Sequence, residues 1–279
     1  MVDHIARYGP ITFEAFMDAA LYDDQHGYYP TRRRNPGSTP VGTDGDYFTS
    51  PSSHPAFGAL IALQLDEMWR NMGSPGEFTV VEMGGGDGTL GSDISEYVQQ
   101  ELPEFAHAMS YASTDLVPPT GSDQVGDGSQ LPVGVIGCVI SNELLDAFPV
   151  NRFIVQGGEV KEIFVDFRDG HFVESVGDVS APEIAGRVEP FLGSLPESYR
   201  GEVNLRLGYW SDSVAATLES GYVITIDYGY DRPELYKPVR VDGSLRCYYQ
   251  HTLGQNPLRR IGSQDITAHV DFTTVDHTL

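Results

Sequence analysis

Three glycines at alternate positions, Gly84, Gly86 and Gly88, are the residues whose spacing first indicates a ligand site. An apolar run with β-branched residues at 78–83 precedes them and predicts a buried parallel strand. Apolar residues then recur at the spacing of one helix face, which predicts a helix over 90–101. Glycine tolerates a positive φ and lets a ligand approach the main chain, while a helix start offers unpaired N–H groups. This combination of strand, turn and helix predicts a nucleotide-binding hinge.

The glycine order separates two kinds of nucleotide ligand. A dinucleotide fingerprint has a small residue at the sixth position from Gly84, where this chain has Thr89. An NAD-dependent oxidoreductase is therefore disfavoured. Glu82 stands two residues before the first glycine, and this pattern resembles motif I of the class I S-adenosyl-L-methionine (SAM) methyltransferases. Because a glycine motif alone is a weak signal, a plain turn stays open as the alternative.

Polar residues follow two further predicted strands. The second strand is expected to end near Asp115, where a Rossmann-like site holds the ribose hydroxyls, although a turn-forming role is the alternative. Residues 133–141 are the most apolar strand and are expected to lie centrally in a covered sheet. Asn142, Glu143 and Asp146 come directly after it. Ligands of open α/β sheets bind outside the carboxyl ends of the strands, so this trio is placed for chemistry.

The trio could bind a cationic acceptor. If a helical turn begins after the strand, Glu143 and Asp146 face the same side. If the acceptor were an arginine, a carboxylate could bind its guanidinium group bidentately and aim one nitrogen at a methyl donor. Asn142 could bind the amino-acid part of SAM or the acceptor. The alternative is helix capping, with Asn142 as N-cap and Glu143 favoured by the helix dipole.

Composition limits the classes of function. The chain has 279 residues, with Lys+Arg 17 against Asp+Glu 40 and a net charge of −23. This charge argues against nucleic acid as a partner. It suits a cationic substrate, but salt adaptation of the source would produce the same excess. Two cysteines without a framework indicate a reducing compartment. Without an apolar signal core or a membrane-spanning stretch, we expect a soluble cytoplasmic protein with no membrane insertion.

Two helices are predicted before the glycine-rich turn, over residues 12–22, capped by Thr12, and over 56–72. Residues 23–46 between them are rich in Gly, Pro, Asn and Asp and predict a long exposed loop. The arginines at 32–34 could grip an anionic group, but a solvated charge run is favoured. The buried face of the second helix is predicted to comprise Phe57, Leu60, Ile61, Leu65, Met68 and Trp69.

After the apolar strand, two short strands predict an antiparallel insertion at about residues 151–205. A helix over 210–218 is predicted to be closed by Gly221, and a strand over 222–226 to end directly before Asp227. The predicted fold is α/β, with a mostly parallel sheet and flanking helices. Its expected division is a helical segment at 1–76 packed on the core, and a Rossmann-like domain at 77–279 with a substrate-side segment at about 231–279.

These segments together are similar to the MidA-like methyltransferases. That family includes the mitochondrial assembly factor that methylates an arginine on a complex I subunit, together with bacterial relatives. The resemblance spans nearly the whole chain. It is carried by GPITFEAFMDAALYDDQHGYY, GDYFTSP, HPAFGALIALQL, VEMGGGDGTL, SNELLDAFPV, IDYGY, GSLRCYYQH and DITAHVDFT, in family order.

The resemblance implies a class I SAM-methyltransferase fold, SAM as cofactor, and methyl transfer to an arginine of a protein substrate, with a complex I subunit as a candidate. Glu82 and the three glycines would shape the cofactor pocket, and Asp115 would hold the ribose. Glu143, Asp146 and Asn142 would be catalytic, with Asn142 also near the cofactor. The substrate side would contain Asp227, His251, Asp265, His269 and Asp271. No close pair of histidines shares a helical face, so no metal site is predicted.

Two departures from the family pattern keep an alternative open. Ser52 stands where the family usually has a glutamate, and the family usually continues beyond DITAHVDFT with helices and the last two strands of a seven-stranded sheet. We therefore expect the last strands to be missing or finished differently. A non-catalytic SAM-binding or assembly-factor module is the alternative to an enzyme. The oligomeric state does not follow from the sequence.

Overall fold

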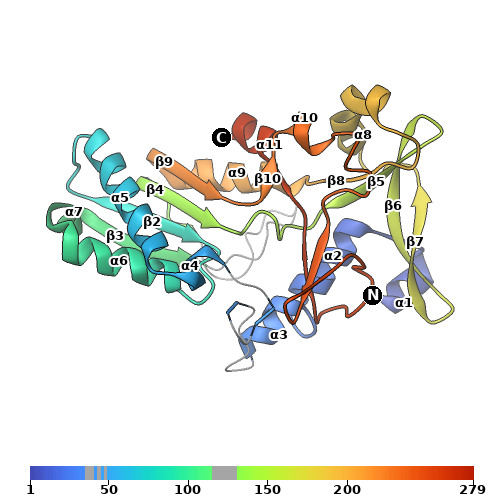
Figure 1. Cartoon of the computed structure of the whole chain (residues 1–279), viewed down its shortest axis with the longest axis horizontal. Coiled ribbons are helices and arrows are strands. Elements are labelled where there is room, and N and C mark those ends of the chain that lie inside the picture. Colours follow the sequence, from blue (N-terminus) through green and yellow to red (C-terminus); the bar gives the residue numbers. More distant parts are fainter. Residues whose placement is uncertain (35–40, 43–44, 47–48, 115–130) are drawn as a thin grey trace.

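Two β-sheet regions lie side by side in the computed structural model, which describes residues 1–34, 41–42, 45–46, 49–114 and 131–279 (Figure 1). One region is built on a parallel sheet, and the other on an antiparallel sheet. The carboxyl ends of the parallel strands point toward the second region (Figure 1). Residues that follow these strands therefore lie between the two regions.

The parallel sheet has the strand order β3-β2-β4-β9. Its members are β2 (Phe78–Met83), β3 (Met109–Thr114), β4 (Val135–Asn142) and β9 (Leu218–Ile226). All neighbours pair in parallel, and β4 lies between β2 and β9, as its apolar sequence predicted. The chain order reverses between β2 and β4. Open α/β sheets bind ligands at this switch point, at the carboxyl ends of the strands.

Helices cover both faces of this sheet because its strands alternate apolar residues between them. The helices are α5 (Ala56–Asn71), α6 (Thr89–Glu101) and α7 (Pro103–Ala108) on one face, and α9 (Arg206–Thr217) and α11 (Phe272–Thr278) on the other. Phe78 and Val80 of β2 pack with the first set, and Val81 and Met83 with the second. Each such buried side chain stabilises the fold by roughly 1.5–3 kcal/mol. The predicted Rossmann-like α/β fold is confirmed.

The antiparallel sheet has the order β1-β6-β5-β8, with β7 added to β6. Its strands are β1 (Ile11–Thr12), β5 (Asn151–Gln156), β6 (Glu159–Arg168), β7 (His171–Gly177) and β8 (Arg200–Val203). Helix α8 (Pro182–Val188) and a 3₁₀ turn, η1 (Glu189–Ser194), pack against it through Ile184 and Val188. Residues 151–203 thus leave the parallel sheet after β4 and return at α9.

Residues 1–76 contribute to two different cores. They form α1 (Val2–Tyr8), α2 (Phe13–Tyr22), α3 (Tyr28–Arg34), α4 (Ser50–Ser53) and α5. As predicted, α2 begins after Thr12, whose Oγ1 accepts a 3.1 Å hydrogen bond from the amide of Ala15. Its buried face, Phe13 and Phe16 included, packs with Val165 of β6 and with the C-terminal segment. By contrast, α5 packs on the parallel sheet.

The C-terminal segment joins the two regions. It contains β10 (Gly229–Tyr230), α10 (Arg232–Leu235), β11 (Arg246–Tyr249), β12 (Thr252–Gly254), β13 (Asp265–Thr267), β14 (Val270–Asp271) and α11. Strands β12, β11 and β13 form a small antiparallel sheet, and β10 pairs with β14. Cys247 and Ile266 of this segment lie in the same core as α2.

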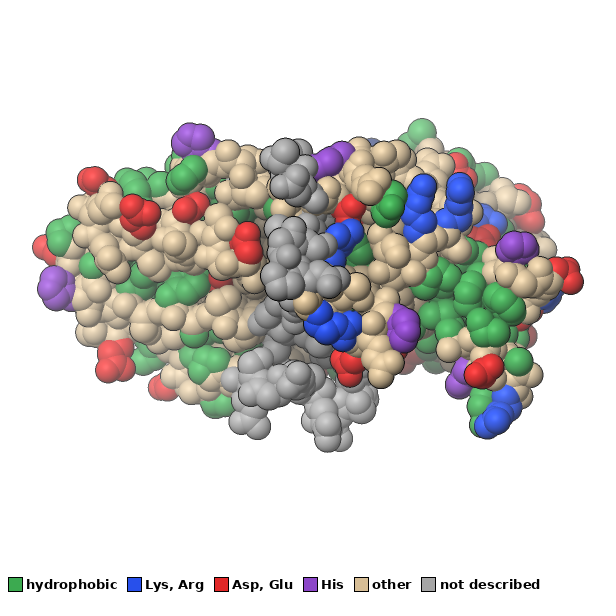
Figure 2. Space-filling model, turned by 90° about the horizontal axis from the view of Figure 1, so that it is seen from below, with side chains coloured by type: hydrophobic (Ala, Val, Ile, Leu, Met, Phe, Trp, Pro, Cys, Tyr) green, Lys and Arg blue, Asp and Glu red, His purple; other side chains and the backbone are tan. Residues whose placement is uncertain are grey.

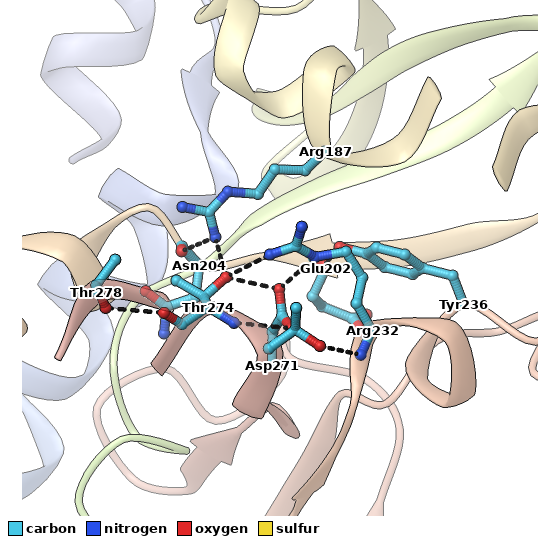
Figure 3. Close-up of polar contacts among 9 residues, drawn as sticks. Arg187, Glu202, Asn204, Arg232, Tyr236, Asp271, Thr274 and Thr278 are labelled. Carbon is cyan, nitrogen blue, oxygen red and sulfur yellow. Dashed lines mark hydrogen bonds and ion pairs between the residues drawn. The ribbon is translucent and has the colours of Figure 1, made fainter. Parts of the chain in front are cut away.

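A buried polar cluster fixes α11 (Figure 3). The Thr274 hydroxyl accepts hydrogen bonds of 2.8 Å from both Arg187 and Arg232, and donates one of 2.7 Å to Asp271. The Asp271 carboxylate also binds Arg232 Nε at 2.8 Å and accepts the Thr274 amide at the start of α11. Asp271, expected on the substrate side, is therefore engaged in holding α11.

Three predicted features differ from the structure. Residues 28–34 of the expected loop form α3. Tyr28 at its start is fully buried, and no periodic pattern in the sequence predicts that burial. Leu60, expected in the core, is 64 % exposed on α5. Gly221 does not close the preceding helix but lies within β9 at a φ of 151°. A Cβ there would come 1.9 Å from the carbonyl oxygen of Gly137, so the close approach of β4 and β9 requires glycine.

Candidate functional site

The glycine-rich turn after β2 faces open space at the switch point of the sheet. Gly84, Gly86 and Gly88 have φ values of 77°, 55° and 79°, which favour glycine at all three positions. A Cβ on Gly86 or Gly88 would meet nothing within 4 Å. A Cβ on Gly84 would lie 2.8 Å from Cδ1 of Leu144, in the segment after β4. The turn therefore packs against that segment while its other glycines leave room for a ligand.

The Glu82 side chain lies against the glycine-rich turn. It is buried, and a Cβ on Gly85 would come 2.8 Å from its Oε2 and 1.9 Å from Oγ of Ser113. Burial and the Glu82 carboxylate both raise the pKa of Tyr111. Gly85 is thus the most tightly enclosed glycine of the turn, and the pattern of alternate glycines missed it. Its only signal in the sequence was the run of three consecutive glycines.

No helix follows β4, so the predicted helical turn and its capping alternative are both wrong. Glu143 has a φ of 49°, and its amide donates a 2.9 Å hydrogen bond to the carbonyl of Ile226. The carboxylate of Asp227 accepts the amides of Leu145 at 2.8 Å and Asp146 at 3.2 Å. These bonds satisfy the backbone in an irregular turn, which removes the need for helical pairing.

Asp227 organises the carboxyl ends of two strands. Its other oxygen accepts the amide of Tyr228 at 2.8 Å, so the residue joins the end of β9 to the turn after β4. The carbonyl of Asp146 in turn accepts the Ala268 amide at 2.9 Å. Three segments far apart in the sequence meet here. The structure thus brings Asp227, expected on the substrate side, together with the predicted trio of Asn142, Glu143 and Asp146.

Asp146, Asp227 and Asp265 form a cluster of acids, which we call the acid cluster. Asp146 is 8 % exposed and Asp265 2 %. Burial, reinforced by Asp227, Asp265 and Glu143, raises the pKa of Asp146 well above its usual value. Burial also raises the pKa of Asp227, and that of Asp265 to about 6. No Lys or Arg within the described ranges forms an ion pair with these three carboxylates.

Tyrosines from α2 and α3 border the acid cluster. The hydroxyl of Tyr29 donates a 2.9 Å hydrogen bond to Asp265, and that of Tyr22 a 2.9 Å bond to the carbonyl of Ala147. In β11, Tyr248 lies opposite Asp265 of β13. Residues opposite each other in an antiparallel pair place their side chains on the same face. The cluster is therefore walled by aromatic rings from both ends of the chain.

Asp46 is a further buried acid beside this wall. Its carboxylate binds Arg32, accepts a 2.6 Å hydrogen bond from Tyr28, and accepts the Gln250 amide at 2.6 Å. The Arg32 guanidinium lies 4.5 Å from the centre of the Tyr28 ring. The favoured expectation of a solvated run is therefore wrong for Arg32. Sequence reasoning did not select Asp46, whose only signal was its place in GDYFTSP.

The two predicted histidines lie apart from each other. His251 is exposed in the two-residue turn between β11 and β12, and its amide donates to the carbonyl of Asp46 at 3.1 Å. His269 lies beside the Tyr230 ring, with 5.4 Å between ring centres. Burial and the charges of Arg246 and Arg240 lower the pKa of His269. Asp115 lies outside the described residues.

None of the helices in the described residues is long and apolar enough to cross a membrane. Nor do those residues contain a group of three or more His, Cys, Asp and Glu side chains arranged to hold a metal ion.

Comparison with known proteins identifies relatives over the whole chain. The protein arginine methyltransferase NDUFAF7 homolog, mitochondrial, of Drosophila melanogaster is 27 % identical over 96 % of this chain. Protein arginine methyltransferase NDUFAF7, mitochondrial, of Bos taurus is 33 % identical over 98 %. The chain spans 66 % of the length of each.

A solved structure agrees with this result. A COG1565 superfamily member and likely methyl transferase from Burkholderia thailandensis, bound to S-adenosyl-homocysteine, superposes with a TM-score of 0.81 at 25 % identity. The match covers 99 % of this chain and 73 % of that one. Residues 60–127 and 123–279 match a family described as "Putative S-adenosyl-L-methionine-dependent methyltransferase". The predicted family and its cofactor, SAM, are confirmed, and the chain belongs to this family of SAM-dependent methyltransferases.

Proposed function

We propose that the protein transfers the methyl group of SAM to an arginine side chain of a protein substrate. The observation that carries this proposal is the acid cluster beside the glycine-rich turn, in which buried carboxylates have no ion-pair partner among the described residues. Within the described residues, Arg32 acts on Asp265 through its charge without forming an ion pair with it, and a substrate guanidinium group would add positive charge beside Asp146 and Asp227. The names of the curated relatives, which are protein arginine methyltransferases, support the same acceptor.

The glycine-rich turn fits the cofactor. Gly86 and Gly88 present main chain to open space, and the buried Glu82 side chain lies against Gly85. Asn142 ends β4, and its Oδ1 is buried without a hydrogen-bond partner in the described part of the chain, so it is available to a polar group of the cofactor. Asp115 would hold the ribose hydroxyls. When bound, SAM supplies an electrophilic methyl group on a sulfonium.

Glu143 and Asp146 would orient the acceptor. Transfer requires one guanidinium nitrogen to be aimed at the methyl group, and a bidentate carboxylate fixes the plane of that group. The nitrogen also releases a proton, and a carboxylate of raised pKa accepts it more readily than an ordinary one. Asp227 would act indirectly, by holding the turn that carries both residues.

The distribution of charge favours a cationic partner. The chain carries −23, and Arg70 is the one Lys or Arg between residues 49 and 114. On the face shown in Figure 2, acidic side chains are scattered over the half that contains the parallel sheet. The Lys and Arg side chains visible on this face lie from the middle of the molecule across the other half. This asymmetry would steer a basic protein toward the parallel sheet and the site at its edge.

Two conservative variants test the proposal, Glu143→Gln and Asp146→Asn. Each keeps size and removes charge. We expect methyl transfer to a purified complex I subunit, or to arginine peptides, to fall by about two orders of magnitude or more, while SAM affinity by calorimetry changes by only a few-fold. Normal transfer by both variants would clear these residues. Parallel loss of SAM binding would move them to the cofactor site.

Three further parts of the proposal have their own tests. SAM binding by the wild type without transfer to any arginine substrate would favour the non-catalytic module. A complex I subunit is proposed as the substrate from the family resemblance alone. Comparing methyl transfer to that subunit with transfer to unrelated arginine-containing proteins tests this choice. We also propose a cytoplasmic location, in contrast to the curated relatives, which are named as mitochondrial, and cell fractionation tests it.

A further inference from the structure

Three basic side chains, Arg240, Arg246 and His269, converge beside the acid cluster, and we call them the basic cluster. The pKa of His269 is lowered first by burial and then by the charges of Arg246 and Arg240, so both guanidinium groups lie near its ring. The Arg240 guanidinium lies 4.0 Å from the centre of the Tyr230 ring, and that ring centre lies 5.4 Å from the centre of the His269 ring. Two guanidinium groups gathered in one place favour an anion between them.

None of the three side chains forms an ion pair within the described residues, although the chain has 40 acidic residues against 17 basic ones. Arg240 Nε donates a 3.1 Å hydrogen bond to the carbonyl of Glu234, and Arg246 Nη1 donates one of 2.8 Å to that of Leu245. Each guanidinium group has five N–H donors, so further donors remain available to an anion. His269 Nδ1 is buried and has no hydrogen-bond partner in the described part of the chain.

Ser244 holds the main chain of the basic cluster in place. Its hydroxyl accepts the amide of His269 at 3.0 Å and donates a 2.8 Å hydrogen bond to Glu202. The same carboxylate oxygen of Glu202 also accepts the Ser244 amide at 2.8 Å. This buried acid is therefore engaged with Ser244 and does not neutralise the basic cluster through an ion pair within the described residues.

The register of β11 places Arg246 on the same face as a member of the acid cluster. Arg246 lies opposite Thr267 of β13, and Tyr248 lies opposite Asp265. Alternate residues of a strand share a face and are roughly 7 Å apart, so Arg246 lies about that far along the sheet from Asp265. The intervening Cys247 belongs to the other face, where it is buried in the core of α2. An anion bound to Arg246 would thus lie near a guanidinium group held in the acid cluster.

A second contact joins the two clusters. The Ala268 amide donates a 2.9 Å hydrogen bond to the carbonyl of Asp146, and His269 follows Ala268 directly. The glycine-rich turn instead meets the segment after β4 at Leu144. The basic cluster is therefore attached to the acceptor side of the site, and an acidic group of the substrate suits it better than the carboxylate of SAM.

We propose that the basic cluster binds an acidic side chain of the protein substrate, about two to four residues from the arginine that accepts the methyl group. The inference rests on the proposed methyl transfer and adds substrate specificity to it. A strand advances roughly 3.3 Å per residue, so about three residues span the ~10 Å between a guanidinium group in one cluster and a carboxylate in the other. Without the basic cluster, the acids of the site would repel such a carboxylate.

Three synthetic nonapeptides test the inference with the full chain. Each has the acceptor arginine at its centre. The residues three positions away on both sides are glutamate in the first peptide, glutamine in the second and lysine in the third, and all others are glycine. We expect the wild type to have a KM at least about tenfold lower for the glutamate peptide than for the glutamine peptide, because hydrogen bonds between charged groups are stronger than those to a neutral amide.

Arg246→Gln and Arg240→Gln should each remove most of this preference, which is read as the ratio of the two KM values. Because both peptides share the acceptor and the linker, a general loss of folding or catalysis affects them equally and leaves the ratio unchanged. Arg246→Glu should go further and favour the lysine peptide. The matched control is Arg7→Gln in α1, another arginine beside a tyrosine ring, at 5.9 Å, and it should keep the full preference.

Equal KM values for the glutamate and glutamine peptides on the wild type would overturn the inference, as would variants of the two cluster arginines that keep the wild-type ratio. A loss of SAM affinity in these variants, measured by calorimetry, would also overturn it, because the basic cluster would then hold the carboxylate of the cofactor. A wild type that binds SAM but methylates neither these peptides nor arginine-containing proteins would defeat the proposed function and, with it, the inference.

Discussion

The glycine-rich turn and the acid cluster lie at the same edge of the sheet but are specified differently. The turn is local: its strand, its glycines and its helix occupy residues 78–101. The acid cluster is assembled from residues far apart, Asp146 after β4, Asp227 after β9 and Asp265 in β13. One is a motif, and the other exists only when the chain is folded.

The two sites also differ in their relation to stability. The turn costs the fold little stability, because its positive φ values are ones that glycine adopts freely. The acid cluster holds carboxylates whose charged forms are disfavoured by burial, so it opposes folding at neutral pH. This difference indicates that the turn is specialised for main-chain contact and the cluster for charge. Variants at each should therefore fail in distinct ways.

The largest effect is expected from Gly86→Val. At a φ of 55°, valine is strained, and its side chain would fill the open space above the turn. SAM affinity should fall at least about a thousandfold, or roughly 4 kcal/mol, in a calorimetric titration. Gly186→Val in α8 is the control, since that glycine has an ordinary φ and open surroundings. Unchanged affinity in a folded Gly86 variant would remove the turn from the cofactor site.

The sequence was sufficient for the local half of this comparison. The apolar run of β2, the glycine spacing and the apolar face of α6 depend on neighbours in the chain, and the predicted strand, turn and helix are all present. The buried face of α2 followed for the same reason. The central place of β4 could be inferred because only a strand covered on both faces is apolar throughout.

Distant contacts decided what the sequence could not reveal. The turn after β4 is not helical because Asp227, which lies more than eighty residues later, binds its amides. Helix α3 forms where Tyr28 is buried and Arg32 binds Asp46, and YYPTRRR has no periodicity to announce it. The role of Asp46 likewise depends on Gln250 at the other end of the chain.

The second effect concerns charge in the acid cluster. The pKa of Asp265 is about 6 against an ordinary 3.8. Between these values the folded state binds more protons than the unfolded state, so stability falls as pH rises through that window. Asp265→Asn removes the cost of ionising a buried carboxyl and keeps an oxygen that accepts the hydrogen bond from Tyr29. It should be more stable than wild type by about 3 kcal/mol at about pH 8, and nearly equal at about pH 4.

Urea unfolding at the two pH values measures this gain. A parallel assay of methyl transfer should show activity lost as stability is gained, because the proposed acceptor site needs the charge. A variant that is less stable than wild type at both pH values would show that Asp265 is structural and not a charged site residue.

A third and smaller effect is expected from Asp115→Ala, which tests the ribose contact that was predicted from sequence alone. Loss of a charged acceptor for the ribose hydroxyls should weaken SAM binding by roughly 1.5–3 kcal/mol, or about ten- to a hundredfold. Methyl transfer at saturating SAM should then be nearly normal. A change below about threefold would mean that another residue holds the ribose.

The smallest effect is expected from Tyr29→Phe, which tests how the tyrosine hydroxyl changes the pKa of Asp265 in the acid cluster. The Tyr29 hydroxyl donates a 2.9 Å hydrogen bond to Asp265 and so lowers the pKa of that buried carboxyl. Its removal should raise the pKa further, destabilising the fold above that pKa, where the folded carboxyl is charged. The loss should be about 1–2 kcal/mol at about pH 8 and smaller at about pH 4, where a protonated Asp265 forms the weaker bond.

The same change in the Asp265→Asn background isolates this contact. There Tyr29 meets a neutral acceptor at every pH, so the loss should be small and independent of pH. The ring of Tyr29 packs at 5.4 Å from that of Tyr22, and phenylalanine keeps this packing. An equal loss of stability in both backgrounds would therefore mean that the Tyr29 hydroxyl acts through some other contact. It would also show that Tyr29 does not stabilise the charged form of Asp265.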